Sequence, residues 1–541
     1  MNMQNRHHDI WPPGRPFSLD PSPHSVFHNL LAAARRHPDH TAIWYYGRTL
    51  SYAQLLDEVR SLAGYLHHRA GVRPDDRVAI YMQNAPQFII AYYAIMAANA
   101  VIVPVNPMCR GAELAHILRD SGARAIVFGA ELAPEIPADL DPAACIAVRY
   151  ADYIPETPEI EPPAQILATP DAPRATPWLA AIAAGLTPPE HTRGPQDWCI
   201  IPYSSGTTGM PKGCLHTHAS VNATIFAYPE WVGMEEGARV LATLPFCHVT
   251  GMQNSMNMPI LAGATIHILT RWNAEAAARV IEAKRIGHWR SITTMMIDFL
   301  SLPEIETYDL SSLQGVGGGG AQMPEAVARK MARLIGLDYL EAYGLTETMA
   351  PSHMNPPQAP RPQCLGIPIF DVDSRIIDPE TLEELGPNQP GEIIIHGPQV
   401  FQGYWQRPEE TDAVFLDIDG KRFLRSGDIG YVDEQGYFYF TDRLKRMVNV
   451  SGLKVWPAEV EAILHGHPDI AEACIVADPD PRTGEAVRAV IVPAGSQTDL
   501  PVEPLTEWCR ANMAAYKVPK RFEFRDALPR SGTGKVLWRT L

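Results

Sequence analysis

The stretch YSSGTTGMPKG, residues 203–213, decides the fold of this chain. Its glycines free the backbone so that several N–H groups can converge on one anion, and its hydroxyls and lysine add donors and positive charge. The stretch follows an apolar run at residues 199–202, which is typical of a buried strand. We therefore predict a phosphate-binding loop at the end of a strand. The residues expected to contact phosphate are Ser204, Ser205, Gly206, Thr207, Thr208, Gly209 and Lys212.

The loop has two other interpretations. It does not follow the Walker A pattern, because Pro211 stands where that pattern has a glycine before its lysine. Clusters of Ser, Thr and Gly also mark surface turns. The composition of the loop alone leaves a flexible surface loop open as the alternative.

Helical and strand patterns alternate on the N-terminal side of the loop. Residues 51–68 have the apolar spacing of a helix, residues 77–82 are rich in β-formers, and the same order returns at 114–121 and 125–128. This alternation predicts α/β layers with mostly parallel sheets. Residues 154–197 are rich in Pro, Ala and Thr, and we interpret them as a surface excursion.

An apolar run at residues 88–103 is borderline in length for a membrane span. A buried helix over residues 86–98, a left-handed cap at Asn99 and a short buried strand ended by Pro104 explain the run better. We therefore predict no transmembrane segment here.

The last hundred residues have the pattern of a small α+β unit. Helical spacing at residues 458–465 and 505–513 encloses two β-rich runs at 470–477 and 486–492. A polar, basic stretch precedes this unit and sets a boundary near Lys445. The predicted domains are residues 1–444 and residues 445–541.

Bulk properties limit the classes of partner. The 541 residues carry a formal net charge of -16, which argues against a nucleic-acid partner because phosphate backbones need a basic footprint. The eight cysteines are scattered without CxxC spacing, and residues 1–16 lack an apolar segment. These features predict a reduced, cytoplasmic protein without a secretory signal.

Further motifs follow the loop in a fixed order. They are YGLTET at 343–348, SGDIG at 426–430, DRLK at 442–445, VSG at 450–452 with PAEVE at 457–461, and PRSGTGK at 529–535. Together with the loop they resemble the adenylate-forming superfamily, which contains acyl-CoA synthetases, aryl-CoA ligases, luciferases and the adenylation domains of peptide synthetases. The resemblance covers residues 25–539. It implies a large N-terminal domain of layered α/β subdomains, with mixed sheets flanked by helices and a small β-barrel-like subdomain, and a small mobile α+β C-terminal domain.

The same resemblance implies an ATP-dependent carboxylic acid:CoA ligase. The acid and ATP would form acyl-AMP and pyrophosphate, and CoA would then accept the acyl group and release AMP. ATP, Mg²⁺ and CoA are the expected small-molecule partners beside the acid. A stand-alone enzyme that loads a carrier protein is the alternative, and a homodimer is left open.

The resemblance also implies catalytic roles for single residues. Glu347 would hold Mg²⁺ with Thr208 nearby, and Thr346 would contact phosphate. Lys535 would bridge the acyl carboxylate and the α-phosphate, and His248 belongs to the segment that closes the acyl site. The expected catalytic residues are therefore Lys535, Thr346, Glu347 and His248.

Other positions are expected to bind the nucleotide or CoA. Tyr343 would stack on adenine, and the two oxygens of Asp428 would accept the ribose hydroxyls together with Arg443. Lys445 would be the hinge of the C-terminal domain, and Gly452 would let pantetheine pass close to the backbone. The stretch that borders adenine and the acyl pocket includes Gly319, Gly320 and Ala321.

The acyl pocket is expected to be apolar. The segments that line it by analogy are 224–231, 248–256, 293–297 and 317–321, and they contribute aromatic and methionine side chains with few charges. This composition implies a medium-chain or long-chain fatty acid or an aryl acid as the substrate.

Weaker signals point to other classes. Residues 315–320, GVGGGG, satisfy the GxGxxG pattern and have Glu341 about twenty residues further on, which alone favours an NAD-dependent oxidoreductase. His216 and His218 could suggest a metal pair, but no third ligand with zinc spacing accompanies them. Cys247 is interpreted as a structural thiol. A nucleotide-binding sensor without activity is a further alternative, against which the intact charged motif residues argue.

Overall fold

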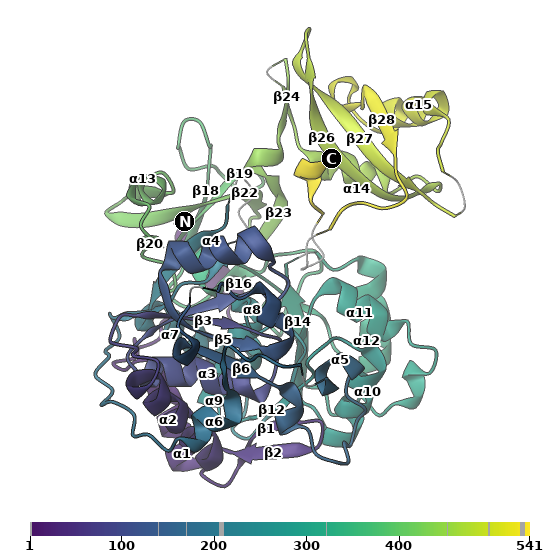
Figure 1. Cartoon of the computed structure of the whole chain (residues 1–541). Coiled ribbons are helices and arrows are strands. Elements are labelled where there is room, and N and C mark those ends of the chain that lie inside the picture. Colours follow the sequence, from purple (N-terminus) through teal and green to yellow (C-terminus); the bar gives the residue numbers. More distant parts are fainter. Residues whose placement is uncertain are drawn as a thin grey trace. The chain divides into compact units, whose positions relative to one another are not determined.

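The computed structural model describes residues 3–138, 140–168, 170–204, 210–320, 322–451, 453–495, 498–530 and 536–541. The chain forms two compact units (Figure 1). The larger unit contains Asn5–Asp373 and Ile395–Leu424, and the smaller unit contains Met1–Gln4, Ser374–Ile394 and Arg425–Leu541. The division runs through the strands β18 (Asp373–Ile377), β19 (Gly391–His396) and β22 (Lys421–Val432).

The first sheet of the larger unit is mostly parallel. Its strand order is β17-β16-β15-β14-β13-β11-β12-β1-β2. The strands from β15 to β1 run parallel, whereas β16, β17 and β2 pair antiparallel at the two edges. The strands are β1 (Thr41–Tyr45), β2 (Arg48–Ser51), β11 (Arg239–Ala242), β12 (Thr265–Ile268), β13 (His288–Ser291), β14 (Gly315–Gly319), β15 (Leu340–Leu345), β16 (Ala350–Met354) and β17 (Ile367–Pro368).

The second sheet of the larger unit has the order β20-β10-β8-β4-β3-β5-β6-β7, and β9 also pairs with β10. The strands from β8 to β7 run parallel, and β10 pairs antiparallel with β8, β9 and β20. The strands are β3 (Arg77–Tyr81), β4 (Val101–Val105), β5 (Ala123–Gly129), β6 (Cys145–Val148), β7 (Thr176–Pro177), β8 (Trp198–Ile200), β9 (Tyr203–Ser204), β10 (Lys212–Thr217) and β20 (Gly403–Tyr404).

Helices pack on both sheets, and α10, α11 and α12 lie side by side (Figure 1). The mostly parallel sheets with flanking helices confirm the predicted α/β class. The helices of the larger unit are α1 (Phe27–Arg36), α2 (Tyr52–His68), α3 (Pro86–Ala97), α4 (Gly111–Ser121), α5 (Ala164–Leu167), α6 (Trp178–Ala183), α7 (His218–Val232), α8 (Val249–Met252), α9 (Met258–Leu261), α10 (Ala274–Lys284), α11 (Thr293–Leu300), α12 (Glu325–Ile335) and α13 (Pro408–Asp412). A π-helical turn, Gln253–Asn257, joins α8 to α9.

The predicted helix at residues 51–68 is confirmed as α2. Ser51 accepts the N–H of Gln54, and the Gln54 side chain accepts the N–H of Ser51 in return. This capping box satisfies two N–H groups that a helix start otherwise leaves without partners.

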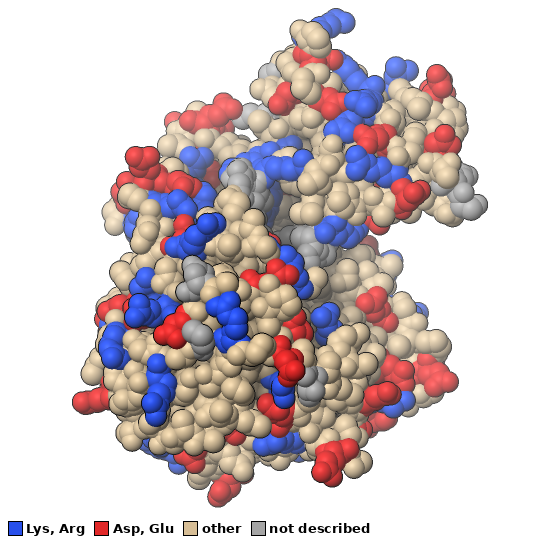
Figure 2. Space-filling model, viewed as in Figure 1, with Lys and Arg blue, Asp and Glu red and all other residues tan. Residues whose placement is uncertain are grey.

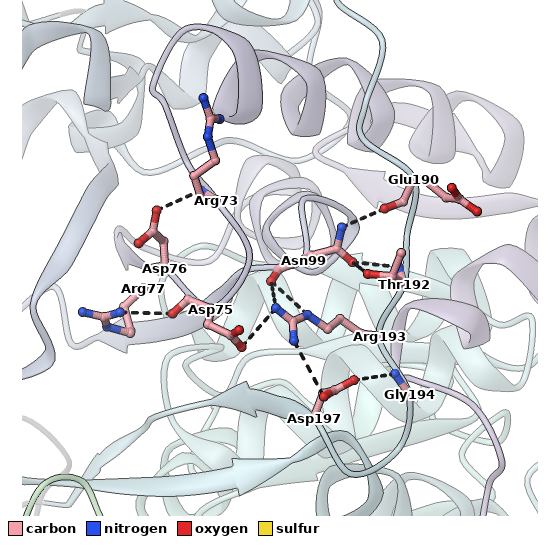
Figure 3. Close-up of polar contacts among 10 residues, drawn as sticks. All are labelled: Arg73, Asp75, Asp76, Arg77, Asn99, Glu190, Thr192, Arg193, Gly194 and Asp197. Carbon is pink, nitrogen blue, oxygen red and sulfur yellow. Dashed lines mark hydrogen bonds and ion pairs between the residues drawn. The ribbon is translucent and has the colours of Figure 1, made fainter.

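Asn99 ends α3 in the left-handed conformation that the sequence predicts, with φ of 61°. Its amide nitrogen donates to the Glu190 carbonyl at 2.8 Å, and its amide oxygen accepts the Thr192 N–H at 2.9 Å (Figure 3). The Asn99 carbonyl also accepts from the guanidinium of Arg193. The cap therefore fastens the excursion at residues 154–197 to the body of the larger unit.

The prediction that Pro104 ends the following strand is wrong. Pro104 lies within β4, in register with Ile80 of β3. The Ile102 carbonyl faces β8 and accepts the N–H of Ile201. Backbone groups two residues apart in a strand face the same side, so the nitrogen of Pro104, which carries no hydrogen, also faces β8. The β4–β8 pairing consists of Ile102 and Ile200 alone, and β4 therefore loses no ladder bond at the proline.

The glycine run at residues 315–320 is a strand rather than a loop. Residues Gly315–Gly319 form β14, between β13 and β15. A dinucleotide-binding fold needs these glycines in the turn between a strand and a helix. The geometry of the run therefore does not fit the oxidoreductase interpretation.

The smaller unit contains the predicted C-terminal α+β pattern. Its sheet has the order β25-β24-β27-β26, and β28 pairs parallel with β27. The predicted helices and strands of this part are present; the boundary at Lys445 stays a prediction. The elements are β23 (Phe438–Arg443), β24 (Val448–Val450), β25 (Leu453–Val455), α14 (Pro457–Leu464), β26 (Ile470–Asp480), β27 (Gly484–Pro493), α15 (Val502–Asn512) and β28 (Arg521–Phe524).

None of the helices in the described ranges is long and apolar enough to cross a membrane. The apolar run at residues 88–103 is instead divided between the buried helix α3 and the buried strand β4. On the face shown in Figure 2, acidic and basic side chains are interspersed.

Candidate active site

The base of the predicted phosphate loop is a short antiparallel ladder. Ser204 on β9 lies opposite Lys212 on β10, and Tyr203 lies opposite Gly213. The ladder brings the two ends of the loop together, as an anion-binding turn requires. The loop residues Ser205, Gly206, Thr207, Thr208 and Gly209 lie outside the described residues.

The segment with Tyr343, Thr346 and Glu347 lies at the carboxyl end of β15, the edge at which α/β sheets bind ligands. The hydroxyl of Thr348 accepts the N–H of Leu345 at 2.8 Å and closes the turn. All three predicted site residues are half-buried there. This arrangement leaves each side chain partly open to a ligand.

Two left-handed residues follow this turn. Met349 and Ala350 have φ of 46° and 68°, a conformation that costs non-glycine residues energy. The hydroxyl of Thr224 donates to the Met349 carbonyl at 3.1 Å, and the amide of Gln253 donates to that hydroxyl at 2.7 Å. Buried side chains of α7 and the π-helical turn thus hold the strained backbone next to Glu347.

His216 supports the same turn from β10. Its Nε2 lies 2.9 Å from the Thr346 carbonyl, and its Nδ1 lies 3.2 Å from the hydroxyl of Ser220. Burial lowers the pKa of His216 to about 4, so the ring is neutral at physiological pH. A carbonyl only accepts, so Nε2 carries the proton and donates to Thr346. His216 is therefore a structural residue, and the described residues contain no cluster of three or more His, Cys, Asp or Glu that could hold a metal ion.

Glu347 is joined to Lys212 through one tyrosine. The hydroxyl of Tyr404 donates to Oε1 of Glu347 at 2.9 Å, and Nζ of Lys212 lies 4.9 Å from the centre of the Tyr404 ring. Lys212 also forms an ion pair with Glu410. Burial and the Glu347 charge raise the pKa of Tyr404, which therefore stays a neutral donor. The fold thus brings together two predicted site residues that are far apart in the sequence.

The glycines at the end of β14 allow a close approach of backbone. A Cβ on Gly319 would lie 2.2 Å from the Ala342 carbonyl, and Gly320 has φ of 89°. Both positions require glycine for these reasons. Gly319 is next to Ala342 in register and thus close to Tyr343, while Ala321 lies outside the described residues.

His248 is an exposed residue that starts α8. Its Nδ1 accepts the N–H of Thr250 at 3.4 Å. Helix α8 packs against β16, the strand that follows the Glu347 turn. Beside it, burial raises the pKa of Cys247 to about 12, which leaves the thiol protonated and fits the structural interpretation.

Asp428 and Arg443 lie opposite each other on β22 and β23 of the smaller unit. Nε of Arg443 is 3.1 Å from Oδ1 of Asp428, whose side chain is almost completely buried. The preceding Gly427 is left-handed, with φ of 68°, and its N–H donates to Glu392. The Ser-Gly-Asp turn therefore holds the Asp428 carboxylate in a fixed position.

The predicted hinge stretch is bound to α14. Oδ2 of Asp442 accepts the N–H of Ala458 at 2.5 Å, and Arg446 pairs with both Asp442 and Glu461. Lys445 lies in a 3-10 turn, Leu444–Arg446, between these two anchors. Gly452 and Lys535 lie outside the described residues.

Sequence reasoning missed the residues that orient the predicted ones. Tyr404 and Glu410 follow the apolar pair Val400 and Phe401 and belong to none of the motifs above. No local signal marks them, because the pairing of β20 with β10 that brings Tyr404 to Glu347 exists only in the folded sheet. Of the predicted pocket residues, Met252, Met256 and Met296 are fully buried in the core, and the indole of Trp231 donates to the Asn355 carbonyl.

Comparison with known proteins identifies relatives over nearly the whole chain. Residues 30–405 match the family described as AMP-binding enzyme, and residues 459–535 match the AMP-binding enzyme C-terminal domain. The long-chain-fatty-acid–CoA ligase of Bacillus subtilis is 33% identical over 96% of this chain and 95% of its own. A feruloyl-CoA synthase from Amycolatopsis is 34% identical over 93% of this chain and 96% of its own.

A solved structure has the same fold. The ATP-bound MatB of Rhodopseudomonas palustris superimposes with a TM-score of 0.82 at 26% identity, over 95% of this chain and 98% of that one. The comparison thus confirms the predicted fold class, which has a large N-terminal part and a small C-terminal part.

Proposed function

This chain belongs to the AMP-binding enzyme family and is an AMP-forming acyl-CoA synthetase, and we propose that it joins an apolar carboxylic acid to coenzyme A in an ATP-dependent reaction. The observation that carries the proposal is the contact chain from Lys212 through Tyr404 to Glu347 at the base of the predicted phosphate loop. These contacts connect Lys212, the cation proposed to bind phosphate, with Glu347, the carboxylate proposed to bind a metal ion.

In the first step, a carboxylate oxygen of the acid attacks the α-phosphorus of ATP, and the bond to pyrophosphate breaks. Two anions must approach each other, so positive charge has to lie close by. Lys212 would supply part of it after leaving its ion pair with Glu410. Thr346 would donate its hydroxyl to a phosphate oxygen, while His216 holds its backbone in place.

Glu347 suits the proposed Mg²⁺ site. Mg²⁺ prefers oxygen ligands and is usually held by one or two carboxylates together with phosphates. Oε1 of Glu347 accepts from Tyr404, which fixes the rotation of the carboxylate. The bound ion would neutralise charge that develops on the phosphates. The second proposed ligand, Thr208, rests on the resemblance.

The proposal assigns the ribose to Asp428 and Arg443 of the smaller unit. The ion pair with Arg443 holds the buried carboxylate of Asp428 in place, and its oxygens would accept the ribose hydroxyl groups. Tyr343 would stack on adenine close to Gly319, which is in register with the neighbouring Ala342.

In the second step, the CoA thiolate attacks the acyl carbonyl and AMP leaves. We propose that Lys535 serves the first step and that rotation about Lys445 opens a path for pantetheine past Gly452. Support comes from the family resemblance of the motifs that carry these residues. We further propose that the protein works in the cytoplasm. In support, its cysteines are free, and seven of the eight are buried.

The experiment that tests the function measures pyrophosphate release with ATP and Mg²⁺ over a panel of carboxylic acids, with and without CoA. Release that depends on one class of acid and is faster with CoA is the expected result. Acid-dependent release that ignores CoA would point to a carrier protein as the acceptor. Absence of release with every acid would contradict the ligase proposal.

A further inference from the structure

One arginine in the larger unit, Arg290, is buried and has no carboxylate partner within the described part of the chain. Arg290 on β13 is 4% exposed, and its Nε and Nη2 are buried without a hydrogen-bond partner among the described residues. Burial lowers its pKa to about 10, so the guanidinium is still charged at neutral pH. A buried charge without a partner destabilises a protein.

Two other arginines, the half-buried Arg193 and the buried Arg375, have carboxylate partners. Arg193 pairs with Asp75 at 3.0 Å and lies 3.7 Å from Asp197 (Figure 3). Arg375 pairs with Glu384 at 3.3 Å. Among the described residues, the buried Arg290 thus differs from the buried Arg375, which has a carboxylate partner.

The neighbouring strand makes room for this guanidinium. Gly317 of β14 is in register with Arg290, and a Cβ there would lie 2.2 Å from Nη1 of Arg290. Two residues earlier, a Cβ on Gly315 would lie 2.9 Å from Nδ1 of His288. Glycines at 315 and 317 therefore accommodate the side chains of β13, which gives the glycine run a role beyond the acyl pocket.

The aromatic contact of Arg290 also has an unused polar atom. The guanidinium carbon lies 4.5 Å from the centre of the Tyr228 ring, a cation–π contact. The hydroxyl of Tyr228 is buried and has no hydrogen-bond partner among the described residues. Arg290 and Tyr228 thus place several donors together that are not satisfied by the described protein.

The position of this pair points to the acyl group as its ligand. Arg290 lies near the carboxyl end of β13, the edge at which the predicted site residues lie. Its neighbour Gly317 is two residues before Gly319, which corresponds to about 7 Å along a strand. Tyr228 lies within the predicted pocket segment 224–231.

We propose that Arg290 and Tyr228 bind a second carboxylate at the far end of the acid, so that the preferred substrate is a dicarboxylic acid with an apolar middle. The inference rests on the proposed ligase function. A planar guanidinium matches a carboxylate with two parallel hydrogen bonds, and the phenol can donate a third. The bound anion would supply the partner that the buried cation lacks.

The first measurement compares acids of equal length that end in a methyl, a hydroxyl or a carboxylate. Pyrophosphate release is followed for each length with ATP, Mg²⁺ and CoA. At one length, we expect kcat/KM for the dicarboxylic acid to exceed that of the methyl-ended acid at least about tenfold, as for an ion pair in a desolvated site. A preference for methyl-ended acids at every length would overturn the inference.

Two variants of the site separate recognition from folding. Arg290→Met should lower kcat/KM for the dicarboxylic acid about 100-fold and change that for the methyl-ended acid less than about threefold. Tyr228→Phe keeps the ring, and we expect it to weaken the same preference by a smaller factor. An equal loss for both acids in Arg290→Met would contradict the role of Arg290 in recognition.

Thermal melting without ligand gives an independent readout. Arg290→Met removes an unpaired buried charge and should raise the melting temperature or leave it unchanged. The matched control, Arg193→Met, breaks a carboxylate-paired arginine and should lower it. A similar fall in both variants would show that Arg290 is a structural residue and overturn the inference.

Ligand-induced melting shifts separate the inference from the function. The dicarboxylic acid should raise the melting temperature of the unmodified protein but not that of Arg290→Met. Such a shift without any pyrophosphate release would support the carboxylate site and contradict the ligase proposal. Release without any preference for the end group would support the ligase and overturn the site.

Discussion

At the scale of single residues, contacts from outside the motifs set the orientation of the candidate catalytic groups. Tyr404 holds the Glu347 carboxylate, and His216 holds the Thr346 carbonyl. Both partners are neutral donors, because burial raises the pKa of the phenol and lowers that of the imidazole. Their hydrogen bonds therefore persist over the physiological range of pH.

Tyr404→Phe tests the role of this orientation. The change removes one hydrogen bond to a charged group, which is worth about 1.5–3 kcal/mol. We expect kcat/KM for adenylation to fall about tenfold or more, and the Mg²⁺ concentration at half-maximal rate to rise. Pyrophosphate release against Mg²⁺ concentration measures both. Tyr153→Phe is the control, since its hydroxyl donates to Glu58 instead; equal effects in both variants would contradict the assignment.

Glu341 makes a prediction about pH. Burial raises its pKa from 4.5 to about 7 in the folded protein. Between these values the unfolded state loses its proton while the folded state keeps it, so the free energy of unfolding falls as the pH rises from about 4.5 to about 7. The size of this contribution is about 3 kcal/mol.

The measurement is the melting temperature of Glu341→Gln against the unmodified protein at pH 5 and pH 8. The difference between the two pH values should be smaller in Glu341→Gln, because the amide does not titrate. An unchanged difference would mean that Glu341 is not the group responsible.

At the scale of elements, short signals placed one helix end correctly and one strand end wrongly. Asn99 acts through its own φ, and this cap is where the sequence predicts it. The helix predicted at residues 51–68 is present as α2, which Ser51 caps through its neighbour Gln54. Whether Pro104 ends its strand depends on which strand lies on the side that its nitrogen faces. That information belongs to the sheet and not to the local sequence.

The Asn99 cap can be tested by comparing two substitutions. Asn99→Gly loses the amide contacts to Glu190 and Thr192 but suits the left-handed conformation. Asn99→Ala loses the same contacts and adds about 1 kcal/mol of backbone strain. We expect Asn99→Ala to have the lower melting temperature in thermal unfolding. Equal melting temperatures would show that the contacts alone determine the effect.

At the scale of the whole molecule, the two half-reactions are proposed to use different residues of the smaller unit. Lys535→Ala should abolish pyrophosphate release and largely spare thioester formation from supplied acyl-AMP. Equal loss in both assays would contradict the division of roles.

Lys445→Pro should have the opposite effect. Proline restricts backbone rotation, so the thioester step should slow while adenylation remains. The neighbours of Lys445, Asp442 and Arg446, are bound to α14, which leaves the backbone at this turn as the place for rotation under the proposal. A thioester rate equal to that of the unmodified protein would remove Lys445 as the hinge.

The sequence by itself determined the α/β class, the family and most helix and strand positions. These depend on the period of apolar residues, on caps and on motifs, all of which act over a few neighbouring residues. The residues of the candidate site were named from the same motifs.

Only the tertiary structure decided which of these groups touch. Tyr404 reaches Glu347 over 57 residues of sequence, and His216 reaches Thr346 over 130. It also decided that the glycine run is a strand and that Arg290 is buried beside it, with no carboxylate partner among the residues that the structure describes. The physical reason is that strand order and register bring distant residues together, and no local pattern encodes that choice.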